Sequence, residues 1–375
     1  LKQIAKSGKK VLFVATKKQA KQVVAEKAQS VNMPYVIERW PGGMLTNFPT
    51  IRKAVKKMAT IDKLTNDGTY SNLSKREILQ ISRQRAKLDK TLGSIADLTR
   101  LPSALFVIDV MKENIAVREA NRLGIPVFLA EEAPHGHMAI GTTVFPTGIG
   151  MSATWSPTLI EEVGKAIAKE IRSQGAHISY GPVLDLSRDP RWSRVEETFG
   201  EDPVLSGRLG AAMVTGLGSG DLSREHATIA TLKHFLAYAV PEGGQNGNYA
   251  SVGARDLHEN FLPPFREAIE AGALSVMTSY NSIDGIPCTA NHYLLTQLLR
   301  NEWKFRGFVV SDLYSIEGIH ESHFVASTME EAAVQALSAG VDIDLGGDAF
   351  MNLLQAVRSG KQDETQINAA VDRIL

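Results

Sequence analysis

The second half of the chain contains several clusters of side chains that can supply acid–base groups, nucleophiles or hydrogen bonds to a substrate. Each cluster follows a short apolar run, and the clusters are Glu131-Glu132, Arg188 to Arg194, Lys233-His234, Tyr280-Asn281 and Ser311-Asp312. Parallel sheets and barrels place their chemistry at the carboxyl ends of strands. If the apolar runs are parallel strands, these side chains meet on one face and form a site.

The apolar runs alternate with amphipathic segments, which is typical of a parallel α/β barrel. The expected strands cover residues 178–186, 228–235, 274–280, 308–311 and 340–345. Ahead of them, residues 104–136 predict a strand, a helix and a second strand, because two apolar runs flank an amphipathic segment that stops at Gly124. That second strand leads directly into the carboxylates of Glu131-Glu132.

Five stretches resemble the barrel domain of glycoside hydrolase family 3, which includes β-glucosidases and β-xylosidases. They are RLGIPVFLAEEAPHGHMAIGTTVFPT, GPVLDLSRDPRWSRVEETFGEDP, TLKHFLAY, SVMTSYNSIDGIPCTAN and GFVVSDLYSIEGI, spread over about residues 122–375. The resemblance implies an α/β fold, a TIM-like (β/α) barrel that is here incomplete or irregular. It also implies a retaining enzyme that hydrolyses a β-linked glycoside substrate. We expect no cofactor and no metal.

The resemblance also implies a role for individual residues. Asp312 stands where the family has its catalytic nucleophile, and Tyr280 stands where the family flanks that nucleophile. The positions that hold the hydroxyls of the bound sugar correspond to Glu132, Arg194, Lys233 and His234.

The chemistry of glycoside cleavage agrees with these residue types. An oxocarbenium-like transition state favours a carboxylate beneath the anomeric carbon, and in a retaining enzyme that carboxylate forms a glycosyl-enzyme. Taken alone, Asp312 after a strand could equally be the N-cap of a helix. The four other polar strand ends favour the functional interpretation.

The general acid/base is the part of the machinery that the sequence does not supply. Most of the family takes this group from a second domain after the barrel, whereas this sequence stops at Leu375. A subgroup carries it in an Asp-Ser-His motif after the Lys-His pair, but here that region is LAYAVPEGGQNGNY. We therefore expect impaired catalysis.

The first half of the chain differs from the second in charge and in pattern. Residues 1–130 contain 24 Lys and Arg against 10 Asp and Glu, and residues 131–375 contain 17 against 31. Short strands near residues 11–15 and 35–37 flank a helix, and a basic helical hairpin follows at about residues 51–92, with Ser74 and Glu77 as a capping box. Such a hairpin can neutralise phosphates without reading sequence, or it can simply be a solvated charged face.

Residues 1–128 resemble the S two family of small-subunit ribosomal proteins. The motifs are GGMLTNFPTIRKAVKKM, KREILQISRQRAKLDK and LPSALFVIDVMKENIAVREANRLGIPVF. The resemblance implies an α/β/α sandwich whose hairpin contacts ribosomal RNA, although the family's N-terminal segment and its IVDTN continuation are absent. The alternative function is therefore an RNA-binding fragment with an inert appendage.

The two resemblances overlap at residues 122–128, which predicts a chimera with its seam at about 122–130. The expected domains are residues 1–103, a partial ribosomal-type segment, and residues 104–375, in which Ala104 to Leu123 supply a strand and helix to the barrel.

Other features of the sequence argue against a membrane span, an internal disulfide, a metal site and a phosphate-binding loop. No apolar run approaches the roughly 20 residues of a membrane span, and with no leader in view the chain as it stands is expected to be cytoplasmic, although its start at Leu1 suggests a fragment. The single cysteine excludes an internal disulfide. His135 and His137 lack a third metal ligand, and the glycine-rich stretch 216–220 predicts a flexible connection and not a phosphate loop.

Overall fold

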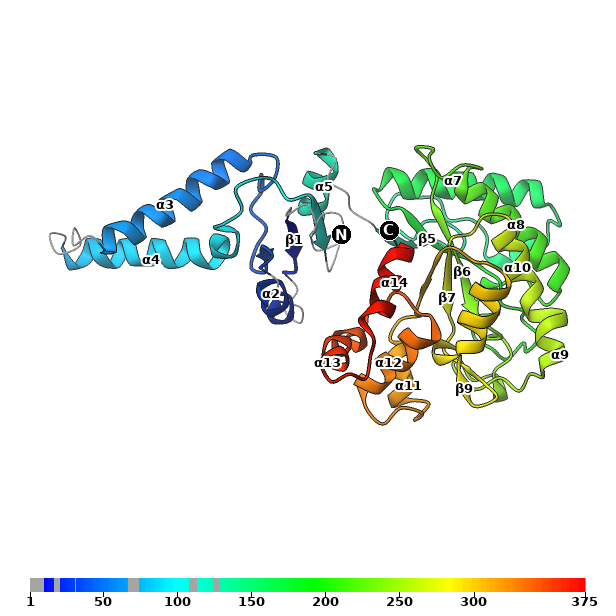
Figure 1. Cartoon of the computed structure of the whole chain (residues 1–375). Helices are drawn as coiled ribbons and strands as arrows, with labels where there is room; N and C mark the ends of the chain where they lie inside the picture. Colours follow the sequence, from blue (N-terminus) through cyan, green and yellow to red (C-terminus); the bar gives the residue numbers. More distant parts are fainter. Residues whose placement is uncertain are drawn as a thin grey trace. The chain divides into compact units, whose positions relative to one another are not determined.

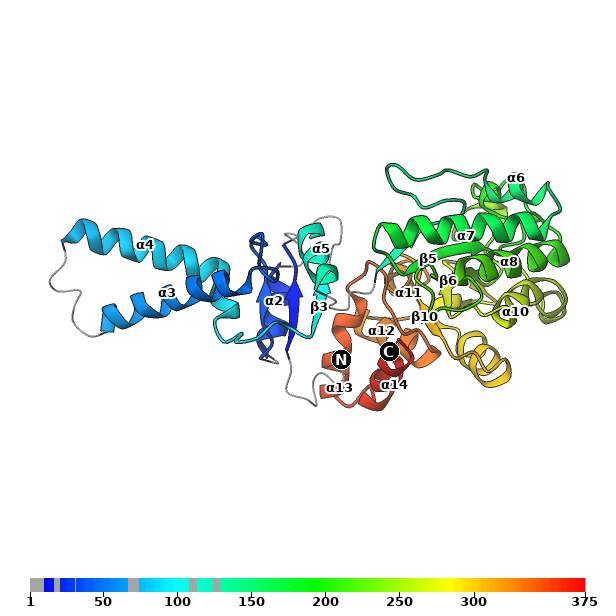
Figure 2. The ribbon, with the colours of Figure 1, turned by 90° about the horizontal axis from the view of Figure 1, so that it is seen from above.

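The chain divides into two compact units, Leu1–Phe128 and Leu129–Leu375. The computed structural model describes residues 10–16, 21–30, 32–66, 74–107, 113–123 and 129–374, and Figures 1 and 2 show its elements. The strands that the ladders join run parallel in both main sheets, so the protein is α/β.

The first unit is built on a three-stranded parallel sheet of order β2-β1-β3. Its strands are β1 (Val11–Val14), β2 (Tyr35–Val36) and β3 (Ala104–Val107), and its shorter helices are α2 (Lys21–Ser30) and α5 (Asn114–Arg122). β1 is the central strand of this sheet, and its side chains Leu12 and Val14 are buried. Such apolar side chains favour the central position.

The predicted helical hairpin is present in this unit as α3 (Phe48–Asn66) and α4 (Lys75–Leu92). Ser74 and Glu77 form the expected capping box at the start of α4. Ile51, Val55, Met58 and Ile61 are the buried stripe of α3. Between the two helices, Arg85 pairs with Asp62 at 2.8 Å.

β3 and α5 belong to the first unit, contrary to the expectation that residues 104–123 complete the barrel. β3 pairs along its whole length with β1, from Val11 opposite Ala104 to Val14 opposite Val107. α5 buries Ala116, Val117 and Ala120 within the same unit. β3 is thus held in the first sheet by its pairing with β1, and the first unit extends to Phe128.

The second unit contains a five-stranded parallel sheet in which consecutive strands are neighbours, with order β10-β7-β6-β5-β4. The strands are β4 (Ala130–Glu132), β5 (Ile178–Val183), β6 (Ile229–Phe235), β7 (Ser275–Thr278) and β10 (Phe308–Val310). A single parallel bridge from Val310 to Ile343 extends it at the β10 edge. Within the described residues no ladder joins that edge to β4, so the sheet is open and the predicted barrel is not closed.

Helices follow the strands and pack on the outside of this sheet (Figure 2). The main ones are α7 (Pro157–Ser173), α8 (Pro203–Gly218), α10 (Leu262–Glu270), the π-helical segment η7 (Tyr293–Glu302) and α12 (Met329–Ala339). Further elements include α6 (Gly148–Ser152), α9 (Ala254–Asp256), α11 (Ser315–Glu321), α13 (Leu353–Arg358), α14 (Glu364–Ile374) and the hairpin of β8 (Ser282–Ile283) and β9 (Ile286–Pro287). Ser156, Asp202 and Thr328 cap the first turns of α7, α8 and α12.

The glycine-rich stretch 216–220 is not the flexible connection that the sequence predicts, because α8 continues through Gly218. A Cβ atom on Gly216 would lie 2.2 Å from the backbone oxygen of Glu161 in α7. The glycines thus allow α7 and α8 to approach closely. α8 ends at Gly218, and the next residue, Ser219, has a left-handed backbone conformation.

Candidate active site

The open ends of the five neighbouring strands bring the predicted residues of the second unit together. Glu132 is the last residue of β4, and Lys233 and His234 lie near the carboxyl end of β6. Tyr280 and Asp312 follow the last residues of β7 and β10 by two positions. Because neighbouring parallel strands end at the same edge, these side chains share one region. Arg194 reaches it from the loop between β5 and α8, where it hydrogen-bonds to His234.

Lys233 is tied to Glu132 across the sheet. Its Nζ donates to Glu132 Oε2 at 2.8 Å, and the Lys233 side chain is only 3% exposed whereas that of Glu132 is 52% exposed. The ammonium is therefore held in place by a carboxylate that itself remains open to solvent. Such a pair offers both a donor and an acceptor to a polyol.

His234 is completely enclosed by charged and aromatic groups. Its Nδ1 lies 2.7 Å from Asp185 Oδ2, and its Nε2 lies 3.1 Å from Arg194 Nη2. Since a guanidinium can only donate, Nε2 must accept, and the ring proton belongs on Nδ1 and is donated to Asp185. Burial lowers the pKa of His234 to about 3, so the ring is neutral.

Arg194 is fixed from two further sides. Its Nε and Nη2 donate to the two oxygens of Glu197 at 2.7 and 2.8 Å. Its guanidinium also lies over the ring of Tyr238, 5.4 Å from the centroid. Burial alone would raise the pKa of Glu197, but the hydrogen bonds and charge of Arg194 outweigh it and lower that pKa.

Asp312 is held by its neighbours through one carboxylate oxygen only. Oδ1 accepts from the backbone N–H of Leu313 at 2.7 Å. Oδ2 is buried and has no hydrogen-bond partner within the described part of the chain, although it lies 3.6 Å from His234 Nε2. Oδ2 thus lies beside the polar cluster without a hydrogen bond of good geometry to any described residue, although the Tyr280 hydroxyl is close enough for the Asp312 carboxylate to raise its pKa.

Tyr280 forms the wall next to Asp312. Its hydroxyl donates to the backbone oxygen of Leu313 at 2.9 Å. Burial first, and then the Asp312 carboxylate, raise the pKa of Tyr280 well above its usual range. Tyr280 therefore stays a neutral donor.

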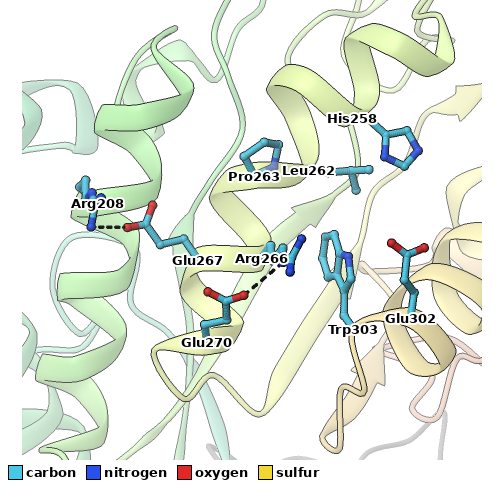
Figure 3. A pocket seen from close by; sticks show the side chains of 9 residues that line it. All are labelled: Arg208, His258, Leu262, Pro263, Arg266, Glu267, Glu270, Glu302 and Trp303. Carbon is cyan, nitrogen blue, oxygen red and sulfur yellow. Dashed lines mark hydrogen bonds and ion pairs between the residues drawn. The ribbon is translucent and has the colours of Figure 1, made fainter.

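Among the hollows on the surface of this unit, one adjoins the cluster and another does not. A hollow of about 670 Å³ is lined by Tyr280 and by Leu313, the residue after Asp312. Figure 3 shows the other, of about 550 Å³, among helix-borne side chains where Arg208 pairs with Glu267 and Arg266 with Glu270. None of the six predicted site residues lines the hollow of Figure 3.

Two members of the cluster are missing from the predicted site: Asp185 and Glu197. Both occur in the stretch GPVLDLSRDPRWSRVEETFGEDP, and Asp185 follows β5 as Asp312 follows β10. A carboxylate at a strand end was thus the available signal for Asp185. Glu197 has no such signal, because it lies in the short helical turn η3 (Val195–Glu197) of a long loop.

His135 Nδ1 lies 3.1 Å from the backbone oxygen of Phe145, and the described residues hold no group of three His, Cys, Asp or Glu side chains that could bind a metal ion. Of the helices described, none combines the length and apolar character that crossing a membrane requires.

Comparison with known families gives a match over most of the chain. The model of the "Glycosyl hydrolase family 3 N terminal domain" matches residues 51–375. That span includes the whole second unit and all six predicted site residues.

Solved structures similar to this chain include β-glucosidases. A β-glucosidase from Erythrobacter marinus is 38% identical, with a TM-score of 0.66, over 70% of this chain and 35% of that one. A β-glucosidase from Listeria innocua in complex with isofagomine is 35% identical, with a TM-score of 0.65, over 70% of this chain and 37% of that one. This chain therefore spans little more than a third of these neighbours.

Among curated proteins, the similar relatives are ribosomal. Small ribosomal subunit protein uS2 of Bacteroides thetaiotaomicron is 99% identical over 128 residues, and that of Bacteroides fragilis is 98% identical over the same length. These are 34% of this chain and 46% of each relative, so the chain spans about half of their length. The motifs of the ribosomal protein lie within residues 1–128, so the two matches overlap at residues 51–128. In this overlap the 99% identity to uS2 is the stronger similarity.

Proposed function

Because this chain belongs to the family of the glycosyl hydrolase family 3 N-terminal domain, we propose that its second unit contains a retaining β-glycosidase site with Asp312 as nucleophile. The observation that supports this most is the Asp312 Oδ2 atom, which is buried beside the polar cluster and unengaged by described residues. A nucleophilic carboxylate needs one oxygen held in place and the other free to attack. The β-glucosidase neighbours give the substrate class.

In this proposal, Asp312 Oδ2 forms a bond to the anomeric carbon while the bond from that carbon to the leaving oxygen breaks. Water then cleaves the glycosyl-enzyme and restores the carboxylate. Lys233, Glu132 and Arg194 hold sugar hydroxyls as donors and acceptors, and His234, whose Nε2 accepts from Arg194 Nη2, keeps that guanidinium in place. Tyr280 keeps the loop after Asp312 in place through its bond to Leu313.

The proposed impairment has a physical basis in the carboxyl groups near Asp312. Glu197 has a lowered pKa and both oxygens engaged by Arg194, so it holds no proton to give at neutral pH. Burial raises the pKa of Asp185 to about 7, but its side chain is 0% exposed and cannot reach a leaving group. Substrates that need protonation of the leaving oxygen should therefore react slowly, since general acid help contributes about 10² to 10⁴ in rate.

Aryl β-glucosides test this proposal. A substrate with a good leaving group needs no proton, so it should glycosylate Asp312 and release a burst of phenol, followed by a slow phase that azide accelerates. Asp312→Asn should abolish the burst, and Asp284→Asn, on the exposed turn between β8 and β9, should not. Lys233→Met or Glu132→Gln should mainly raise the substrate concentration that gives half of the maximal rate, because these side chains are proposed to bind the sugar. Rapid hydrolysis of an unactivated disaccharide would contradict the missing acid, and no burst would contradict the nucleophile.

A second candidate function, contact with ribosomal RNA, is favoured by the 99% identity to uS2 over 128 residues. The hairpin α3–α4 exposes Lys53, Lys56 and Lys57 on one helix and Arg83 and Lys87 on the other. Such side chains neutralise phosphates, so affinity should be weak, should not depend on base sequence and should fall steeply with salt.

A salt titration of binding to a small-subunit RNA fragment tests this second function. Lys53→Gln with Lys57→Gln should weaken binding and lower the salt slope by about 2. Lys169→Gln with Lys304→Gln, both exposed in the second unit, should change neither. Binding that is insensitive to salt, or equal loss in both double variants, would rule the hairpin out as the contact.

A further inference from the structure

We propose that Asp185 is a positioning residue that fixes His234 as its Nδ1–H tautomer and thereby keeps Asp312 Oδ2 free to attack. This inference rests on the proposed glycosidase function. It assigns a role in the reaction to a side chain that touches neither the sugar nor the reacting atoms.

The geometry leaves Asp185 little other role. Its Oδ2 accepts both from His234 Nδ1 at 2.7 Å and from the His234 backbone N–H at 3.2 Å, so one oxygen fixes the ring and its backbone together. The side chain of Asp185 is 0% exposed and that of His234 is 1% exposed. Solvent therefore cannot supply the acceptor that Nδ1–H needs.

The position of one proton then decides the state of Asp312. With the proton on Nδ1, His234 Nε2 presents a lone pair, which accepts from Arg194 Nη2 at 3.1 Å. That lone pair cannot donate to Asp312 Oδ2, which lies 3.6 Å away. Oδ2 accordingly keeps the electron pair that forms the bond to the anomeric carbon.

The other tautomer would reverse this arrangement. An Nε2–H would point its proton into the space shared with Arg194 and Asp312, lose the bond from Arg194 and be drawn to the Asp312 carboxylate. A hydrogen bond to the attacking oxygen would lower its nucleophilicity. Burial lowers the pKa of His234 to about 3, so the ring is neutral and the choice lies between these two tautomers.

The first measurement reads the tautomer directly in the full chain. Imidazole ¹⁵N spectra recorded above pH 7, where the Asp185 carboxyl is ionised, should show Nδ1 protonated and Nε2 bare in the parent. The His234 signals are assigned by their loss in His234→Gln. Nε2–H in the parent would overturn the inference, whether or not any variant folds.

The second measurement uses variants and a trapping reagent. Asp185→Asn keeps an acceptor oxygen, so it should keep the tautomer and most of the rate at which a 2-deoxy-2-fluoro aryl β-glucoside labels Asp312. Asp185→Ala removes that oxygen and should give Nε2–H with labelling slower by roughly 10- to 100-fold, the range seen when a supporting hydrogen-bond partner is lost. Asp284→Asn serves as the control.

The outcomes separate this inference from the proposed function. If the parent is not labelled at Asp312, the glycosidase function fails, and the catalytic role of Asp185 fails with it. If the parent is labelled but Asp185→Ala labels equally fast, only the inference is overturned. A slower Asp185→Ala with an unchanged tautomer would also overturn it, because loss of packing alone would explain the rate.

Discussion

Burial sets the protonation of two histidines in the second unit, His177 and His234. His177, just before β5, accepts from the backbone N–H of Leu129 through Nδ1 at 3.3 Å. Burial first, and then the charge of Arg172, lower the pKa of His177 to about 4. A neutral acceptor thus connects the start of β5 to the start of β4.

This shift predicts how stability depends on pH. The folded pKa of His177 lies below the ordinary value of 6.5, so the unfolded chain binds more protons between pH 4 and 6.5. Stability should therefore fall as the pH falls through that window. His177→Gln, which retains an acceptor, should make the free energy of unfolding of the second unit less dependent on pH, by about 1 kcal/mol after allowance for solvent screening.

The measurement is thermal unfolding of both proteins at pH 4.5 and pH 7. His226→Gln, an exposed histidine of the same unit, is the control and should behave as the parent does. A parent and His177→Gln with parallel pH profiles would contradict the prediction.

Most of the candidate site follows from local sequence because its residues come directly after apolar runs. Lys233, His234 and Asp312 are found in that way. Arg194 and Glu197 lie far along a loop whose path depends on tertiary packing, and their pairing is not encoded by spacing. The tautomer of His234 is likewise hidden in the sequence, since it depends on Asp185, 49 residues earlier.

At the scale of elements, one carboxylate joins three segments at the β10 edge of the sheet. Asp342, whose side chain is 0% exposed, pairs with Arg300 of η7 at 2.6 Å and with Arg373 of α14 at 2.7 Å. It also accepts from the backbone N–H of Val309 in β10 at 2.7 Å. The last helix is thereby tied to the strand that leads to Asp312.

Removal of that carboxylate should be costly. Asp342→Ala leaves two partly buried guanidinium groups without their anion, and we expect a loss of about 3–5 kcal/mol in the free energy of unfolding. Arg266→Ala, which breaks an exposed pair with Glu270, should cost less than about 1 kcal/mol. Urea unfolding of the second unit measures both, and similar losses in the two variants would disprove the argument.

Element types were more predictable than element partners. Strand and helix periodicity located the hairpin, β5, β6, β7 and β10. It could not show that β3 pairs with β1, because an apolar run that begins a strand-helix unit fits either sheet. It also could not show that Gly216 lies in a helix, because the close approach of Glu161 is a tertiary fact.

At the scale of the whole molecule, two units with separate sheets and different family resemblances favour the proposal of two independent functions. The first unit has three short strands and leaves Phe106, Ile115 and Leu123 between 41% and 51% exposed. The second has five paired strands over a continuous buried core. A three-stranded sheet buries a smaller apolar core than a five-stranded one, so the second unit should outlast the first.

Limited proteolysis followed by mass spectrometry should therefore leave a fragment that begins near Leu129, the first residue of the second unit. Because every residue of the proposed site lies after that point, the purified fragment should give the same phenol burst as the full chain and should lose all affinity for RNA. Asp312→Asn should in turn leave RNA binding in the full chain unchanged. Faster loss of the second unit, or a burst that disappears when residues 1–128 are removed, would show that the two units depend on each other.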